Sequence, residues 1–267
     1  MIRSVNEILG YRLAALDQDL GTCRDFLFDD RWWTIRHMLA DTGGWLIGQK
    51  VLVSPVMIDK VDWKTRHILL NVSKEQIEKC PAPEEEEPVS REHERKMSRY
   101  YGIPYYWTHA GLWGHAAYPW ALELGVSKDW PEPDKETTET GESNFLRSLK
   151  EVTGYDIRAN DGKVGHVEDL IMDDKTWALR YVVVDTRKWL PGGKKVLLPL
   201  KWAGSVSWVK GEFEMDLSKA EIENGPEFDP EKPVNREYEV QVYDYYGRPF
   251  DANIDKTAQQ HIANPFV

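Results

Sequence analysis

The sequence predicts a mainly β protein made of two small antiparallel β-barrels with short helices and extended aromatic tails. Two observations lead to this prediction: the chain repeats itself, and each copy consists of short β-prone runs separated by turn residues. No helical pattern of roughly 12 residues lies between these runs, which argues against a parallel sheet with crossover helices.

The internal repeat is long and gap-free over most of its length. Residues 4–55 align with residues 148–199, with 19 identities in 52 positions, where chance would give about three. Residues 88–105 also align with residues 233–250, and both segments contain Tyr-Tyr-Gly-x-Pro. The repeated positions expected to be structural are Gly10, Asp17, Gly21, Asp29, Asp30, Trp33 and Arg36 in the first copy and Gly154, Asp161, Gly165, Asp173, Asp174, Trp177 and Arg180 in the second.

The repeat and the composition divide the chain into five expected parts. Between the copies, residues 129–142 contain six carboxylates, one lysine and two prolines, a composition that repels itself and stays extended. We expect proteolysis to cut first within residues 130–143. The parts are a first barrel (1–80), an aromatic and helical tail (81–128), an acidic linker (129–147), a second barrel (148–228) and a second tail (229–267).

The strands of each copy are expected from β-branched and aromatic runs between Asn, Asp and Gly turns. A brief helix should follow each barrel, with Ser73 and Ser218 as N-caps. The expected strands are 156–159, 164–172, 178–184, 194–200, 204–209 and 212–216 in the second copy and 21–28, 34–40, 51–56, 57–62 and 67–72 in the first.

The repeated positions form a pattern that resembles the PRC-barrel domain family. The pattern runs from Gly154-Tyr155 through the aspartates to Trp177, Arg180 and Pro199 in the second copy. The resemblance implies a six-stranded barrel used as a protein-contact and assembly module, known from the photosynthetic reaction centre H subunit and from a ribosome-maturation factor. It specifies the fold more firmly than the biological role.

Aspartates and arginines recur in both copies at positions where they could bind an ion, close a turn or form an ion pair. Asp29-Asp30 and Asp173-Asp174 are expected to close turns, because neighbouring strand residues point to opposite faces and would not converge on one ion. Arg36 is expected to pair with Asp41 or to stack on an aromatic ring, and Arg180 to do the same with Asp185.

The sequence contains no complete metal-binding or catalytic motif. His109 and His115 are close in sequence, but no third metal ligand accompanies them, and no catalytic motif is present. We therefore expect no catalytic residue, no cofactor and no metal site.

The most unusual segment, which we name the aromatic arm, spans residues 99–120 and has neither helical nor strand periodicity. Its rings must pack against a barrel or against another chain. The sequence leaves both alternatives open. The residues assigned to this candidate contact surface are Tyr100, Tyr101, Tyr105, Tyr106, Trp107, Trp113, Tyr118 and Trp120.

Charge and composition limit the classes of partner. With 34 basic and 45 acidic residues the net charge is −11, which argues against nucleic acid and against a basic membrane anchor. No uncharged apolar run of 18 residues predicts an integral membrane segment, and the bacterial cytoplasm is the expected location.

The expected function is that of a non-catalytic scaffold or adaptor that binds a protein partner or a second copy of itself as a homodimer. Two other functions stay open. One is a small-ligand-binding or metal-binding protein, or a weak hydrolase, that uses a cleft between the barrels. The other is a soluble accessory role in photosynthetic electron transport, by analogy with the H subunit.

Overall fold

The structure is a computed structural model, and it describes residues 1–43, 51–81, 89–108, 111–122, 124–125, 146–187 and 193–250. The chain divides into two compact units. Unit 1 contains Met1–Glu7, Ser148–Asp174 and Ala178–Asn253, and unit 2 contains Ile8–Arg147 and Lys175–Trp177. The expected linker, 129–147, lies outside the described residues up to residue 145. Each unit is mainly β, as the sequence predicts.

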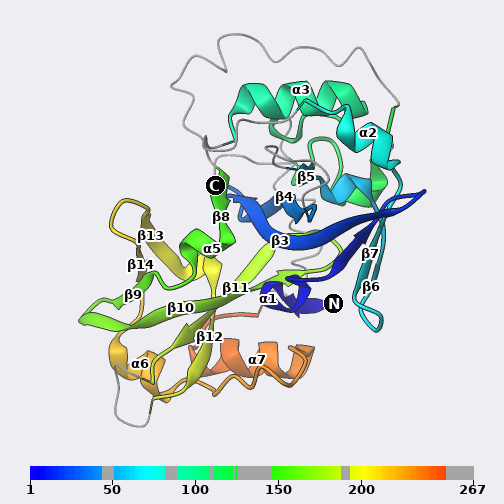
Figure 1. Cartoon of the computed structure of the whole chain (residues 1–267). Helices are drawn as coiled ribbons and strands as arrows, with labels where there is room; N and C mark the ends of the chain where they lie inside the picture. The colour runs from blue at the N-terminus through cyan, green and yellow to red at the C-terminus, as the bar shows by residue number, and fades with distance from the viewer. Residues whose placement is uncertain are drawn as a thin grey trace. The chain divides into compact units, whose positions relative to one another are not determined.

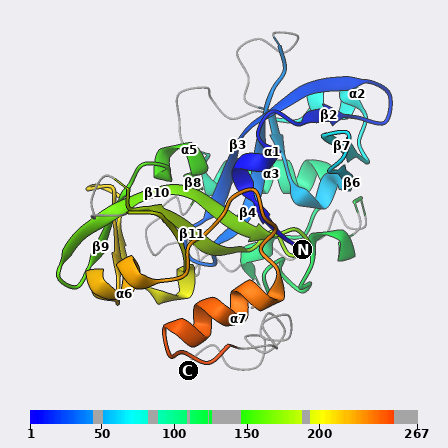
Figure 2. The ribbon, with the colours of Figure 1, turned by 90° about the horizontal axis from the view of Figure 1, so that it is seen from below.

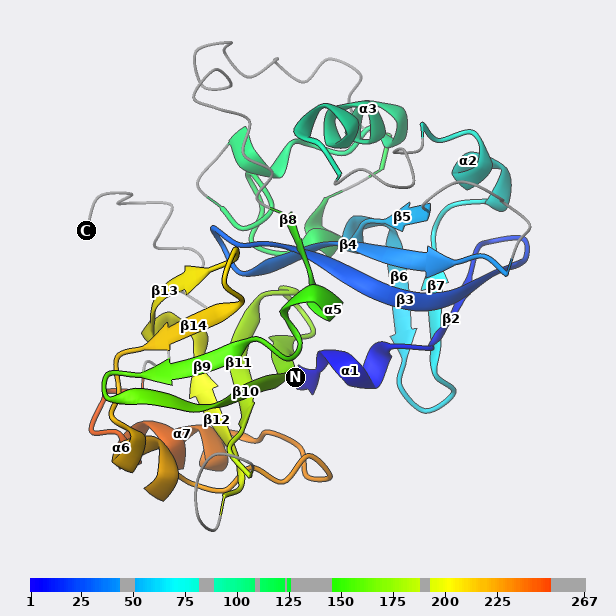
Figure 3. The same cartoon turned by 60° about the vertical axis from the view of Figure 1, so that its left-hand side comes forward.

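Unit 1 is built on a curved sheet from the second copy, with the strand order β12-β11-β10-β9-β14-β13. Figure 3 shows β9, β10 and β11 side by side, with β14 next to β9. Neighbouring strands are antiparallel except β9 and β14, which pair in parallel. The strands are β9 (Asp156–Ala159), β10 (Gly162–Asp173), β11 (Leu179–Asp185), β12 (Lys195–Pro199), β13 (Ala203–Ser207) and β14 (Glu212–Met215).

Unit 2 repeats this order with the strands of the first copy, β5-β4-β3-β2-β7-β6. Here β2 and β7 form the parallel pair, and they lie beside β6 in Figure 2. The expected antiparallel pairing therefore holds except at one equivalent step in each sheet. The strands are β2 (Arg12–Ala14), β3 (Asp19–Asp29), β4 (Thr34–Asp41), β5 (Val51–Val53), β6 (Ile58–Asp62) and β7 (His67–Leu70).

The helices follow local capping signals. Ser73 and Ser218 are N-caps, and each side chain accepts a hydrogen bond from the backbone three residues on in a complete capping box. Figure 1 shows α6 and α7 close to the sheet of unit 1. None of the described helices is long and apolar enough to cross a membrane. The helices are α1 (Val5–Ile8), α2 (Lys74–Glu78), α3 (Arg91–Tyr101), α5 (Leu149–Val152), α6 (Lys219–Asn224) and α7 (Arg236–Tyr245), with 3-10 turns η1 (Pro55–Met57), η2 (Tyr106–Thr108), η3 (Pro119–Ala121) and η4 (Leu200–Trp202).

The two copies exchange their first strands. The strand β1 (Ile2–Ser4) belongs to the first copy but pairs with β10 in unit 1, where Arg3 lies opposite Met172. Its equivalent in the second copy, β8 (Leu146–Ser148), pairs with β3. Residues 175–177, at the turn after β10, likewise belong to unit 2, where the Trp177 carbonyl accepts a hydrogen bond from the Ile35 amide. Each unit therefore contains segments of both copies.

Candidate interaction surface

The aromatic arm begins where α3 ends. Ser90 caps the helix by accepting a hydrogen bond from the His93 amide, and Gly102 ends it with a left-handed φ of 67°. A Cβ at Gly102 would lie 2.7 Å from Gly125, so only glycine allows this close approach. The chain then turns back across unit 2.

A buried carboxylate on α3 holds the arm in place. The Glu94 side chain is 3% exposed, and its Oε1 lies 3.0 Å from His37 Nε2 on β4 and accepts a hydrogen bond of 2.9 Å from the Tyr106 hydroxyl. Arg91 donates to the second oxygen at 2.8 Å. Burial opposes the charge of Glu94, but the His37 hydrogen bond and the Arg91 charge outweigh it and lower the Glu94 pKa. Burial raises the pKa of Tyr106, so its hydroxyl stays a donor.

Arg36 lies beneath the arm and is 1% exposed. Its guanidinium carbon lies 3.8 Å from the Tyr106 ring centroid and 5.1 Å from that of Trp113. Its Nη1 donates to the Leu112 carbonyl, and its Nη2 lies 3.4 Å from Asp29 Oδ2. Of the two interpretations that the sequence allowed, the stack is present, and the acidic partner is Asp29 rather than Asp41. Burial lowers the Arg36 pKa, against the opposing charge of Asp29.

Most of the arm covers its own chain. Tyr101, Tyr105, Tyr106 and Trp113 are all buried, and Trp107 is partly buried against the Tyr105 and Tyr106 rings. Trp113 Nε1 also donates to the Thr176 carbonyl at 2.9 Å. These residues stabilise unit 2, so they are not available to a partner in this conformation.

The exposed aromatic surface of the arm is smaller than the sequence suggests. Trp120 is 67% exposed, and it stacks on Tyr118 with ring centroids 5.2 Å apart and an interplanar angle of 22°. Tyr100 is 39% exposed and packs edge-on against Tyr101. We name the Tyr118 and Trp120 pair the exposed aromatic stack.

The repeated aspartates accept hydrogen bonds from backbone amides or form ion pairs with cationic groups. Asp29 Oδ1 accepts hydrogen bonds from the Arg31 and Trp32 amides at 2.8 and 3.3 Å, which closes the turn after β3. Asp30 instead pairs with Arg147 at 2.9 Å, so the two adjacent carboxylates face different partners. In unit 1, Asp174 pairs with the amino group of Met1, and the Asp173 amide donates to the Ala178 carbonyl.

Two further aspartates fix the start of the helix after each barrel. Asp17 accepts a hydrogen bond from the Lys74 amide, and its equivalent Asp161 accepts one from the Lys219 amide.

Other repeated positions meet backbone constraints. A Cβ at Gly21 would lie 1.9 Å from the Asp41 carbonyl, and one at Gly165 would lie 2.6 Å from the Asp185 carbonyl. Positive φ recurs at equivalent places, as at Gly10 and Gly154 (80° and 95°) and at Trp33 and Trp177 (50° and 60°).

Residues 146–222 match the family model described as the PRC-barrel domain, and this range holds β8, the six strands β9 to β14 and the first part of α6. The second copy is thus similar to a PRC-barrel domain. The first copy, with the same strand order and parallel pair, gives a tandem arrangement of two such sheets. A search of curated proteins gave no match to this chain.

Three anchors of the arm were missed by sequence reasoning. Glu94, His37 and Arg91 were not assigned, although a signal existed: Arg-Glu-x-Glu recurs in both tails, with Arg236 and Glu239 as the counterparts of Arg91 and Glu94. A glutamate repeated in an otherwise divergent tail indicates a side-chain contact with a residue of the sheet, as Glu94 makes with His37 and Glu239 with Tyr181.

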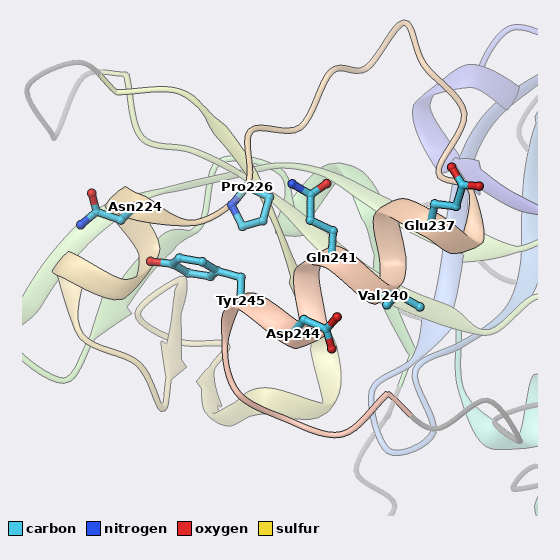
Figure 4. Close-up of a pocket in the computed structure, with 7 residues that line it drawn as sticks. All are labelled: Asn224, Pro226, Glu237, Val240, Gln241, Asp244 and Tyr245. Carbon is cyan, nitrogen blue, oxygen red and sulfur yellow. The ribbon is translucent and has the colours of Figure 1, made fainter.

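Hollows near these residues are small or shallow. A cavity of about 20 Å³ beside Arg36, His37 and Trp107 has room for one water-sized group. Figure 4 shows an open depression beside α7, where Tyr245 lies near Asn224 and Pro226. Its carboxylates, Glu237 and Asp244, are exposed, as on an ordinary solvated helix face.

Metal-binding groups do not gather in the part of the chain that the structure describes. In this part, no three His, Cys, Asp or Glu side chains lie together as a metal site. His115 is exposed, and His109 lies outside the described residues.

Proposed function

We propose that the protein is a non-catalytic interaction and assembly module that binds a protein partner through the exposed aromatic stack. The observation that carries this proposal is the 67% exposure of Trp120 on an arm in which Tyr101, Tyr105, Tyr106 and Trp113 are buried. Tryptophan and tyrosine are favoured anchors of protein interfaces because they bury a large area with few rotatable bonds. The match to the PRC-barrel domain supports this assignment, because the resemblance implies a module for protein contact and assembly.

The proposal includes no catalytic step. The most buried titratable groups of unit 2 are bound to one another: Glu94 to His37 and Arg91, and Arg36 to Asp29. Such a balanced network stabilises a fold, and none of its charges is left to act on a substrate. We place the partner in the bacterial cytoplasm, where the two free thiols, Cys23 and Cys80, would stay reduced.

The experiment compares the full chain with Trp120→Ala. Light scattering over a concentration series measures self-association, and a pull-down from native lysate identifies retained proteins. We expect wild type to self-associate or to retain a defined partner, and Trp120→Ala to lose that contact while its thermal unfolding is unchanged.

Trp32→Ala is the matched control, because Trp32 is also exposed (36%) but lies outside the arm. Loss of the contact in Trp32→Ala alone, or a wild-type chain that is strictly monomeric and retains nothing, would refute the proposal.

A further inference from the structure

Arg180 in unit 1 occupies the same backbone position as Arg36 in unit 2. On β4 the register shifts between the pairs Leu27–His37 and Phe28–Ile35, which leaves Arg36 at a bulge. On β11 the register shifts between Ile171–Tyr181 and Met172–Leu179, which leaves Arg180 at the equivalent bulge. A bulge redirects its side chain, so the two arginines are presented by the same local geometry.

The surroundings of the two arginines also correspond. In unit 2, Glu94 of α3 contacts His37, the residue after Arg36. In unit 1, Glu239 of α7 accepts a hydrogen bond from the hydroxyl of Tyr181, the residue after Arg180. We name these two places the Arg36 corner and the Arg180 corner. Each consists of a bulge arginine, the next strand residue and a buried helix carboxylate.

The difference lies in what covers each corner. The Arg36 corner holds the Tyr106 and Trp113 rings, the Leu112 carbonyl and the Tyr106 hydroxyl on Glu94. Among the described residues, Arg180 is partly exposed and has no hydrogen bond, ion pair or ring contact. Among the described residues, Glu239 accepts one hydrogen bond, from Tyr181, whereas Glu94 contacts three side chains. The second tail is described as far as Phe250, whose ring lies against Tyr243 and Arg236 rather than Arg180.

We propose that the Arg180 corner binds an aromatic segment of a partner protein, one that places a tyrosine and a tryptophan on the guanidinium as the arm does on Arg36. This inference rests on the proposed interaction function and adds a second contact surface, in unit 1. The chemistry is specific. The guanidinium stacks between two rings and donates to a backbone carbonyl, and the tyrosine hydroxyl donates to Glu239.

The occupant is argued from the chain itself, because the Arg36 corner shows which segment this arrangement accepts. Its two rings come from Tyr106 and Trp113, seven positions apart in a Gly-rich stretch. The partner segment should therefore carry tyrosine and tryptophan at a similar spacing without helical periodicity.

The probe is a fluorescent peptide with the sequence of residues 103–122, titrated with the full chain and followed by anisotropy. We expect saturable binding that weakens about tenfold or more in Arg180→Ala. Arg158→Ala is the matched control, because Arg158 is an exposed arginine in the same unit, paired with Glu212 on the neighbouring strand. It should bind as wild type does. A peptide in which alanine replaces the residues equivalent to Tyr106 and Trp113 should not bind.

The outcomes separate this inference from the proposed function. Equal binding by wild type and Arg180→Ala, or no binding by wild type, overturns the inference. Binding that appears only in a chain shortened to end at Phe250 would also overturn it, because the chain's own tail would then be the occupant. Competition by inorganic phosphate but not by unlabelled peptide would indicate an anion site instead. If Trp120→Ala still abolishes partner capture in any of these cases, the proposed function stands without the Arg180 corner.

Discussion

The Arg36 corner and the Arg180 corner have the same bulge, the same arginine and the same helix carboxylate, yet among the described residues only the Arg36 corner is covered. The two copies keep the same strand order and share 19 of 52 aligned residues, whereas the tails diverge after Tyr-Tyr-Gly-x-Pro. The barrel therefore provides a place for an aromatic cover, and the tail sequence decides whether the cover comes from the same chain. A duplicated fold can in this way keep one copy for stability and free the other for binding.

The comparison assumes that each unit contains segments of both copies, and a crosslink tests this with an all-or-none result. Arg3→Cys with Met172→Cys should form a disulfide, because these residues lie opposite each other on β1 and β10. Arg3→Cys with Phe28→Cys is the matched control, since Phe28 is the first-copy equivalent of Met172. Cys80→Ser removes the more exposed native thiol from both variants.

A protease site inserted within residues 130–143 makes the crosslink visible. After cleavage, the Arg3–Met172 variant should run as one band on a non-reducing gel, and the control as two. The control gives two bands whether or not its disulfide forms, because Arg3 and Phe28 lie in the same fragment, so titration of free thiols measures that disulfide. A disulfide only in the control would show that β1 completes the sheet of its own copy.

Sequence reasoning recovered the tandem arrangement and most strands, because local turn chemistry and β propensity determine them, but it did not predict the three-residue strands β1, β2 and β8. It did not recover the exchange of β1 and β8. The acceptor strands β3 and β10 occupy the same place in their sheets and offer backbone partners to either donor, so an alignment cannot say which sheet a strand completes.

The candidate site was recovered only in part, for a similar reason. The density of aromatic residues assigned the whole arm to the candidate surface. Whether a given ring is buried depends on residues far away in the sequence, such as Arg36 and Thr176. Trp113 and Trp120 look alike in the sequence, yet one is 2% exposed and the other 67%.

The largest energetic difference between the corners should come from removing each arginine. Arg36→Ala leaves Asp29 without its buried cation and the Leu112 carbonyl without its donor, and should lower the free energy of unfolding by about 3–5 kcal/mol. Arg180→Ala should change it by less than about 0.5 kcal/mol, because no described contact is lost. Urea unfolding followed by tryptophan fluorescence measures both. Equal losses would mean that Arg180 is held by contacts of comparable strength.

A smaller effect isolates the tyrosine hydroxyl that joins the arm to α3. Tyr106→Phe removes the 2.9 Å hydrogen bond to Glu94 and keeps the ring on Arg36, so it should cost about 1–3 kcal/mol. Tyr118→Phe is the control, since its hydroxyl has no hydrogen bond among the described residues, and it should be neutral. If the two substitutions cost the same, the Glu94 network does not hold the arm.

The smallest effect concerns the exchanged strand in unit 1 and depends on pH. Asp169 is 9% exposed and accepts hydrogen bonds from the hydroxyl of Ser4, the last residue of β1, and from the backbone amide of Asn6 in α1. Burial raises the pKa of Asp169 from 3.8 to about 6. Because folding favours the protonated acid, its contribution to stability is complete below pH 3.8 and is lost as the pH rises through 6.

Asp169→Asn removes this titration, and its Oδ1 can still accept from the Asn6 backbone amide while its Nδ2 can donate to the Ser4 hydroxyl. Its stability relative to wild type should therefore rise by on the order of 1 kcal/mol between about pH 5 and 7.5. Urea unfolding at the two pH values measures the difference, with Asp244→Asn on the exposed face of α7 as the control. A difference that stays constant or shrinks over this range would mean that Asp169 is already charged at the lower pH. The β1 anchor would then be an ordinary ionised acceptor, and the exchanged strand would be held equally firmly at both pH values.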